Sequence, residues 1–483
     1  MLKETKIIGK IVFYILFFLT AFISCFACIF NNKMENGFEY IAIFPVVYIL
    51  FAMIIFLQLK LLKKNKSKGM ITIYTFLILQ WLRLVLLPLV GSISGYFQYY
   101  NFFIDEKSLY TSTLLILLET VFTFLLCIVI IYYSKSSNNY PIKKFKMLGN
   151  KYIYFIFIFI SFILFVFYGR NQYSFFVIPL SKERLSSSIL IRDGSISTSI
   201  IDYGLSFFVI NYLFWCYKKY RINDEKRYLY LALVGILFRL CLISSEGRMS
   251  QIYLTGTFLL LLPQLFPKYK KKIIRGILIV SFAVVGLMTV YKVFAAFLYD
   301  SYYEAIKQSS FELKDTASQI DIYFYGIKTI ARNVFYLQQS GLGVFHSIFD
   351  ILRNTFGLHY FFKGMDYTTL EYYNLFLYNG QSTSGHLFSS IAYGYQYFGL
   401  LLAPLCTCFN LVISLFIERS LKKIKYIELY YIVSIIFIRV SLSIFSNFSQ
   451  TWNVVSRTFI IGMIVIGSSS LFTKRLWKGG TNL

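Results

Sequence analysis

The sequence predicts an all-α polytopic integral membrane protein with about twelve transmembrane helices. Composition is the first observation behind this prediction: of 483 residues, 57% are hydrophobic and only 14% are charged, whereas a soluble protein carries about 25% charged residues. The second observation is that long apolar runs recur from one end of the chain to the other. Each run is long enough to cross a hydrocarbon core of about 30 Å.

The apolar runs define the individual spans. The first run is too long for the core of a signal peptide and is not followed by a convincing cleavage site, so it is counted as a span. The predicted spans are 8–30, 40–59, 70–91, 110–132, 152–168, 200–217, 228–243, 251–267, 276–298, 388–417, 426–446 and 453–472.

The positive charge is concentrated in alternate connections between these spans. The chain has 48 Lys and Arg against 22 Asp and Glu, a formal net charge of +26. By the positive-inside rule, the basic connections and both termini are cytoplasmic. This excess orients the protein and meets anionic lipid, so no nucleic acid is expected as a partner. The basic connections read KLLKKNKSK, KSSNNYPIKKFKMLGNK, KKYRINDEKR, KYKKKIIR, ERSLKKIK and TKRLWKGG.

The spans and loops divide the chain into three predicted regions. Residues 1–298 hold nine transmembrane helices with short loops, 299–387 form a large external loop, and 388–483 hold three further helices and a cytoplasmic tail. A connection as long as 299–387 is expected to have structure of its own. Within it, GVFHSIFDILRNTFGLHYFF spaces apolar residues like one face of a helix, which predicts an amphipathic helix lying flat at the outer membrane surface.

Several basic residues lie inside the predicted spans, in the outer half of the membrane. Burying such a cation costs on the order of 3 kcal/mol, so each should face the bundle interior or snorkel to the headgroups. Glu119 and Asp202 allow one or two ion pairs, which leaves positive charge in excess. An anionic ligand entering from the outer leaflet would neutralise that excess. The basic residues are Arg83, Arg239, Lys292, Arg439 and Arg457; snorkelling suits Arg457 best, because it lies near a helix end.

The segment SSEGRMS, between two apolar runs, is predicted to be a short external turn. Arg248 follows the outer end of one span, and the next begins near Gln251. Free backbone N–H groups and the positive dipole end of that helix favour an anion, and an arginine fork suits phosphate oxygens. The alternative is an ordinary interfacial turn in which Glu246 and Arg248 satisfy each other.

Two further external segments carry candidate residues. The loop between spans five and six contains Arg170, Arg184 and Arg192, which either solvate the loop or form a second clamp on a polyanionic headgroup. His386 lies where the long loop re-enters the membrane, in NGQSTSGHLFSSIAYGYQYFG. It has no Cys, Asp or Glu at metal-ligand spacing, so no metal is expected. The alternative for His386 is a structural role.

These features together resemble the Wzy-type polymerases of bacterial surface polysaccharides, which are similar in build to the O-antigen ligases. The Gly247–Arg248 turn is similar to the SRG-like turn of that superfamily, and SGHLFSSIAYGYQYFG resembles its late motif. The resemblance covers about residues 150 to 472. Glu246 stands where small residues are usual, and Leu387 follows His386 where a ligase has Asn.

The resemblance implies a GT-C-like fold in the bacterial cytoplasmic membrane. It implies a polymerase that transfers a growing glycan from undecaprenyl pyrophosphate to a sugar hydroxyl of the next lipid-linked unit, without metal or cofactor. Arg248 and His386 would be catalytic, and Arg170, Arg184, Arg192, Arg239, Arg439 and Arg83 would bind substrate.

Several points stay open after this reading. The general base is unassigned among His386, Glu246, Asp300, Asp366 and Glu371. A flippase and a chain-length regulator are candidate partners. The alternative functions are a flippase of lipid-linked oligosaccharide, an O-antigen ligase and a non-enzymatic scaffold.

Overall fold

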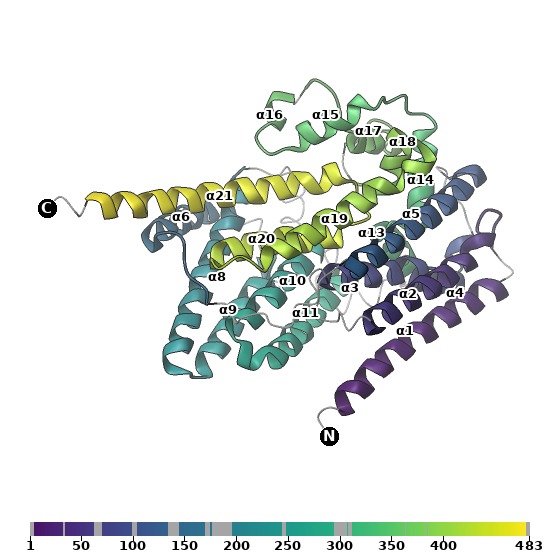
Figure 1. Cartoon of the computed structure of the whole chain (residues 1–483). Coiled ribbons are helices and arrows are strands. Elements are labelled where there is room, and N and C mark those ends of the chain that lie inside the picture. Colours follow the sequence, from purple (N-terminus) through teal and green to yellow (C-terminus); the bar gives the residue numbers. More distant parts are fainter. Residues whose placement is uncertain are drawn as a thin grey trace. The chain divides into compact units, whose positions relative to one another are not determined.

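The chain is helical in the computed structural model (Figure 1). Besides two isolated bridges, the one strand ladder among the described residues is an antiparallel pair, β1 (Ser174–Phe175) and β2 (Leu242–Ile243). The helical fold class is therefore confirmed. The structure describes residues 4–31, 34–61, 70–98, 104–133, 144–169, 174–175, 196–243, 248–293, 307, 312–362, 364–383 and 385–479.

Six stretches of helix within the described ranges are long and apolar enough to cross a membrane, which supports a membrane-embedded protein. A bent pair, Met249–Leu265 and Pro267–Ala283, meets at 116° and would make a seventh span if counted as one. The predicted count of twelve spans stays a prediction. The six stretches are Glu39–Leu59, Met70–Ser94, Glu106–Tyr133, Ser199–Asn223, Pro404–Leu421 and Phe448–Leu471.

The predicted span 388–417 is not one helix, which corrects the sequence interpretation. It consists of α18 (Ser390–Leu402) and α19 (Pro404–Leu421), and the backbone leaves helical geometry at Gly399, with φ 75° and ψ 179°. This left-handed φ is open to glycine at little cost. The chain folds back tightly there, because a Cβ on Gly394 would lie 2.2 Å from the carbonyl oxygen of Ala403.

The chain divides into two compact units. Unit 1 comprises residues 1–139, 312–419 and 440–456, and unit 2 comprises 140–311, 420–439 and 457–483. Helices α20 (Ile427–Leu442) and α21 (Phe448–Gly479) contribute to both, and the last two residues of α19 lie in unit 2. The other helices of unit 1, besides α18 and α19, are α1 (Glu4–Phe30), η1 (Glu39–Ala42), α2 (Ile43–Leu61), α3 (Met70–Trp81), the π-helical turn η2 (Leu82–Leu86), α4 (Leu87–Ser94), η3 (Tyr96–Gln98), α5 (Glu106–Tyr133), α13 (Leu313–Tyr323), α14 (Ile327–Leu337), α15 (Phe345–Asn354), α16 (His359–Phe362) and α17 (Thr369–Leu377).

The segment predicted as a large external loop has helical structure, and part of it lies in the core of unit 1. Helix α14 packs on α5, and α13 packs on α4. Ile327, Ile330, Ala331 and Val334 of α14 are all buried, at the i, i+3, i+4, i+7 spacing of a single helix face. The side of the membrane on which this segment lies stays a prediction.

Unit 2 is built from helices that pack in sequence order, α6 on α8, α8 on α9 and α10 on α11. A Cβ on Gly204 of α8 would lie 2.1 Å from the side chain of Ser161, so glycine lets α6 and α8 approach closely. The remaining elements of unit 2, besides its parts of α20 and α21, are α6 (Lys151–Leu164), η4 (Phe165–Gly169), α8 (Ile196–Asn223), α9 (Arg227–Cys241), α10 (Arg248–Leu265), η5 (Pro267–Tyr269) and α11 (Lys270–Val293).

Candidate anion site

Arg239 lies in the last turn of α9 and is 5% exposed. Its Nη1 donates a hydrogen bond of 3.2 Å to the carbonyl oxygen of Leu242, just beyond the helix end. Its Nη2 lies 3.5 Å from the carboxylate of Asp202 on α8. An ion pair with Asp202 was one of those the sequence allowed. At 3.5 Å the contact is long for a charge-assisted hydrogen bond, which is usually about 2.7–2.9 Å.

The carbonyl of Leu242 connects Arg239 to the start of α10. The Nε2 of Gln251, in the first turn of α10, also points to this carbonyl, at 3.4 Å. Helix α10 begins at Arg248, inside the SSEGRMS segment and three residues before the predicted start near Gln251, so a helix N-terminus is present there. Leu242 also belongs to β2, where it pairs with Phe175 of β1. The strand pair therefore brings the beginning of the loop that contains Arg184 to the same place.

Arg439 and Arg457 share a neighbour, Tyr203 of α8. Tyr203 interacts electrostatically with both guanidinium groups, and its hydroxyl donates a 2.9 Å hydrogen bond to Oγ1 of Thr458. The guanidinium of Arg439 lies 5.0 Å from the ring centroid of Tyr253 on α10, and its buried Nε has no hydrogen-bond partner among the residues that the structure describes. Arg439 and Arg457 also act on each other electrostatically.

These contacts assemble a cationic cluster within unit 2, which we call the arginine cluster: Arg239, Arg439 and Arg457. Asp202 is the carboxylate that interacts with Arg239 and Arg439, so the described groups leave positive charge in excess. Guanidinium groups in a site of low dielectric bind phosphate oxygens strongly. The cluster is therefore suited to hold a polyphosphate group and to stabilise negative charge that develops on it.

Arg83 belongs to unit 1 and has a different environment. In the π-helical turn η2, its Nη1 lies 2.5 Å from Oε2 of Glu119 on α5, and both side chains are fully buried. Thr407 of α19 donates to the other carboxylate oxygen of Glu119, and the ring of Phe445 lies 4.7 Å from the guanidinium carbon. This is a second ion pair of the kind that the sequence allowed. The charge of Arg83 is neutralised by the protein itself.

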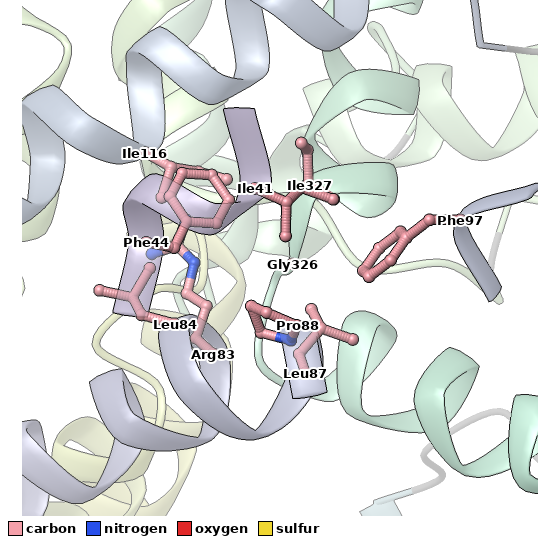
Figure 2. A pocket seen from close by; sticks show the side chains of 10 residues that line it. All are labelled: Ile41, Phe44, Arg83, Leu84, Leu87, Pro88, Phe97, Ile116, Gly326 and Ile327. Carbon is pink, nitrogen blue, oxygen red and sulfur yellow. The ribbon is translucent and has the colours of Figure 1, made fainter. Parts of the chain in front are cut away.

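The hollow beside Arg83 is narrow and apolar, as Figure 2 shows. It has essentially no volume that a water-sized sphere can occupy, and the lining offers no second cation. A hydrated headgroup needs far more room than this. The lining residues are Ile41, Phe44, Arg83, Leu84, Leu87, Pro88, Phe97, Ile116, Gly326 and Ile327.

His386 lies in unit 1, between α17 and α18. Its backbone is fixed to Asn374 of α17: the N–H of His386 donates to Oδ1 at 2.7 Å, and Nδ2 of Asn374 donates back to the carbonyl at 3.3 Å. The imidazole packs on the ring of Tyr378 with a centroid distance of 5.4 Å. Burial, and then the nearby charge of Arg332, lowers the pKa of His386. The imidazole is therefore neutral at neutral pH.

Two of the acids proposed as a general base are already bonded within unit 1. Glu371 accepts from Nη2 of Arg353, at 3.1 Å and 3.2 Å for its two oxygens, and from the backbone N–H of Thr368 at 2.8 Å. Asp366 accepts from the hydroxyl of Tyr372 and from the backbone N–H of Tyr367. Burial alone would raise the pKa of Asp366, but these hydrogen bonds, together with the charges of His346 and Arg353, outweigh it and hold the pKa below its usual value. A carboxylate held in this way is a weak base.

Some predicted residues lie outside the described part of the chain. These are Arg170, Arg184, Arg192, Glu246 and Asp300, together with the side chains of Arg248 and Lys292. Among the described residues, no group of three or more His, Cys, Asp or Glu has the geometry to hold a metal ion.

The sequence indicated no binding role for Arg457, Tyr203 or Tyr253. Snorkelling was the interpretation that suited Arg457 best, and it stays a prediction. In the structure the Nη1 of Arg457 lies 3.4 Å from Oγ of Ser199, and Arg457 shares Tyr203 with Arg439. Tyr203 and Tyr253 carried no sequence signal, because the chain has 41 tyrosines. The predicted topology could have identified Arg457, because it places this residue in the outer half of the membrane together with Arg239 and Arg439.

No family model, no curated protein and no solved structure matches this chain.

Proposed function

We propose that this protein is a membrane glycosyltransferase that polymerises lipid-linked oligosaccharide repeat units. The donor is a growing glycan on undecaprenyl pyrophosphate, and the acceptor is a sugar hydroxyl of the next unit. The observation that carries the proposal is the arginine cluster of unit 2, whose positive charge exceeds the negative charge of the described groups around it, in a chain with helices apolar enough to span a membrane. A lipid pyrophosphate is an anion that reaches such a site from the bilayer.

The donor is already activated, because pyrophosphate is a good leaving group. The enzyme therefore mainly has to supply positive charge that stabilises pyrophosphate as it leaves. The acceptor oxygen forms a bond to the anomeric carbon as the bond from that carbon to pyrophosphate breaks, and the acceptor proton leaves to a base. Pyrophosphate departs with growing negative charge, which preorganised guanidinium groups stabilise. In this proposal Arg239, Arg439 and Arg457 hold the pyrophosphate. Arg248, the first residue of α10, acts with the N-terminal backbone of that helix.

Arg83 has no part in the proposed reaction. Its guanidinium is bonded to Glu119 beside a hollow too narrow for a headgroup. His386 is neutral at neutral pH, and its role as a base or as a group that orients the sugar rests on the resemblance alone. The arrangement of the loop arginines Arg170, Arg184 and Arg192 is open in this proposal.

The test is an Arg248→Ala variant in the native strain, with the surface glycans separated on a gel. Polymerase function predicts loss of the long glycan ladder and accumulation of single repeat units on exported lipid. Arg227→Ala is the matched control, since Arg227 is 63% exposed and paired with Glu225 at the surface; it should leave the ladder intact. Immunoblots of the membrane fraction confirm equal protein in each strain.

Two other results of this experiment would favour other functions. Repeat units trapped on the cytoplasmic face would indicate a flippase, while a normal polymer that fails to reach its final acceptor would indicate a ligase. An unchanged ladder would remove Arg248 from the site.

A further inference from the structure

Helices α15 and α16 of unit 1 pack on each other and together carry a group of exposed apolar side chains. Phe345 and Phe361 are the most exposed of its residues, at 86% and 78%. A surface of this kind marks an interaction site, because isolated exposed side chains are ordinary but a contiguous apolar patch is not. The exposed apolar residues are Val344, Phe345, Ile348, Ile351, Leu358, Phe361 and Met365.

The opposite side of α15 is polar and is bonded to α17, which lies beside it (Figure 1). Asp350 is buried and accepts from the backbone N–H and the hydroxyl of Thr369, at 2.9 Å and 2.5 Å. The pair Arg353 and Glu371 adds a 3.1 Å contact. The charges of α15 are thus satisfied inward, which leaves its outer surface apolar.

The connection from α15 to α16 is bonded to α21, a candidate membrane span that begins at Phe448. Trp452 donates from its indole Nε1 to Oγ1 of Thr355 at 2.8 Å, and the backbone N–H of Phe356 donates to Oγ of Ser456 at 3.0 Å. At about 1.5 Å per residue, these contacts lie about 6 and 12 Å along α21 from its first residue. If α21 enters the membrane at its first residue, the nearer contact lies at the depth of about 5–10 Å that an interfacial amphipathic helix takes.

We propose that the apolar surface of α15 and α16 inserts into one leaflet of the lipid bilayer, as an interfacial platform held at the end of α21. Depth, apolar composition and inward-facing charge all match the arrangement of an interfacial amphipathic helix. Insertion is driven by apolar area rather than by headgroup charge, since the described charges of α15 face α17. Zwitterionic lipid therefore suffices. This inference is independent of the reaction proposed above.

The test uses the full chain in vesicles of phosphatidylcholine alone, with the photo-crosslinking residue p-benzoylphenylalanine in place of Phe361. Leu57 of α2, exposed on a candidate span, is the positive control, and the exposed Gln381 after α17 is the negative control. After irradiation, mass spectrometry measures the fraction of protein that carries a lipid adduct.

Insertion predicts at least about fivefold more lipid adduct at Phe361 than at Gln381, close to the yield at Leu57. The same substitution at Phe345 repeats the measurement on α15. If one of the two variants fails to fold, the other still tests the proposal. A yield at Phe361 no higher than at Gln381 would overturn the proposal. So would crosslinks to a second copy of the chain, or adducts that form only when anionic lipid is added.

Discussion

In unit 1 the guanidinium of Arg83 lies 2.5 Å from a fully buried carboxylate, whereas in unit 2 Arg239 lies 3.5 Å from Asp202, whose side chain is 42% exposed. Arg439 faces the ring of Tyr253. By sequence these three arginines are alike, each set in an apolar helix. The two regions differ in the groups that surround each arginine. Arg83 is paired with a buried carboxylate that joins two helices, whereas Arg239 and Arg439 keep positive charge that we propose binds a ligand.

The largest effect should follow from Arg83→Ala. Removing one partner of a buried ion pair leaves the other charge uncompensated, which costs about 3–5 kcal/mol. We expect loss of folded protein in detergent, measured by size-exclusion chromatography and thermal unfolding. The double variant Arg83→Met, Glu119→Gln removes both charges and should recover most of the folded protein. Normal folding of Arg83→Ala would mean that the two units do not differ as described.

Arg439→Gln should lower the activity more than the stability, which is the reverse of what we expect for Arg83→Ala. Its cation–π contact with Tyr253 is desolvated and contributes about 2 kcal/mol, so Arg439→Gln should lower the stability less than Arg83→Ala does. Loss of a guanidinium that stabilises the departing pyrophosphate should lower polymer formation about 100-fold. The measurement is polymer formed per unit time by purified protein in vesicles, with thermal unfolding alongside. Full activity would exclude Arg439 from the site.

Asp202→Asn also tests the difference between the two units, and we expect a smaller change in ligand affinity from it. The carboxylate of Asp202 neutralises part of the charge of Arg239, so its removal should tighten pyrophosphate binding about threefold, or under 1 kcal/mol. Glu119→Gln in unit 1 should leave that affinity unchanged and lower stability instead. Titration of each variant with inorganic pyrophosphate distinguishes the two. Weaker binding by Asp202→Asn would mean that Asp202 positions Arg239 rather than competing for it.

The smallest effect concerns His386 in unit 1. Its pKa in the folded protein is lowered, so below about pH 6.5 the unfolded chain binds more protons than the folded one. Stability of the junction between α17 and α18 should therefore fall as the pH drops below this value. Amide hydrogen exchange of Ser389 and Ser390 at pH 5.5 and 7.5 measures this, after correction for the intrinsic rate. In His386→Gln the pH dependence should disappear.

Hydropathy located the long apolar helices, because their apolar character is local, while the number of helices that cross the membrane stays a prediction. It did not show the break at Gly399, since a glycine inside an apolar run fits a straight helix and a bend equally well. The sequence also indicated that Glu119 and Asp202 would pair with arginines. It did not show which arginine each would meet, because those contacts join residues that are 36 and 37 positions apart. Only tertiary structure distinguishes Arg83 from Arg439.

The measurement that tests the central claim most directly is the affinity of the purified protein for undecaprenyl pyrophosphate, determined by native mass spectrometry. Three proteins are compared: the unmodified chain, Arg439→Gln, and the double variant Arg83→Met, Glu119→Gln. We predict that Arg439→Gln loses at least about tenfold in affinity, since one guanidinium contact to phosphate contributes over 1 kcal/mol. The double variant should bind like the unmodified chain. Loss of binding in the double variant, with Arg439→Gln unaffected, would contradict the assignment of the anion site to unit 2.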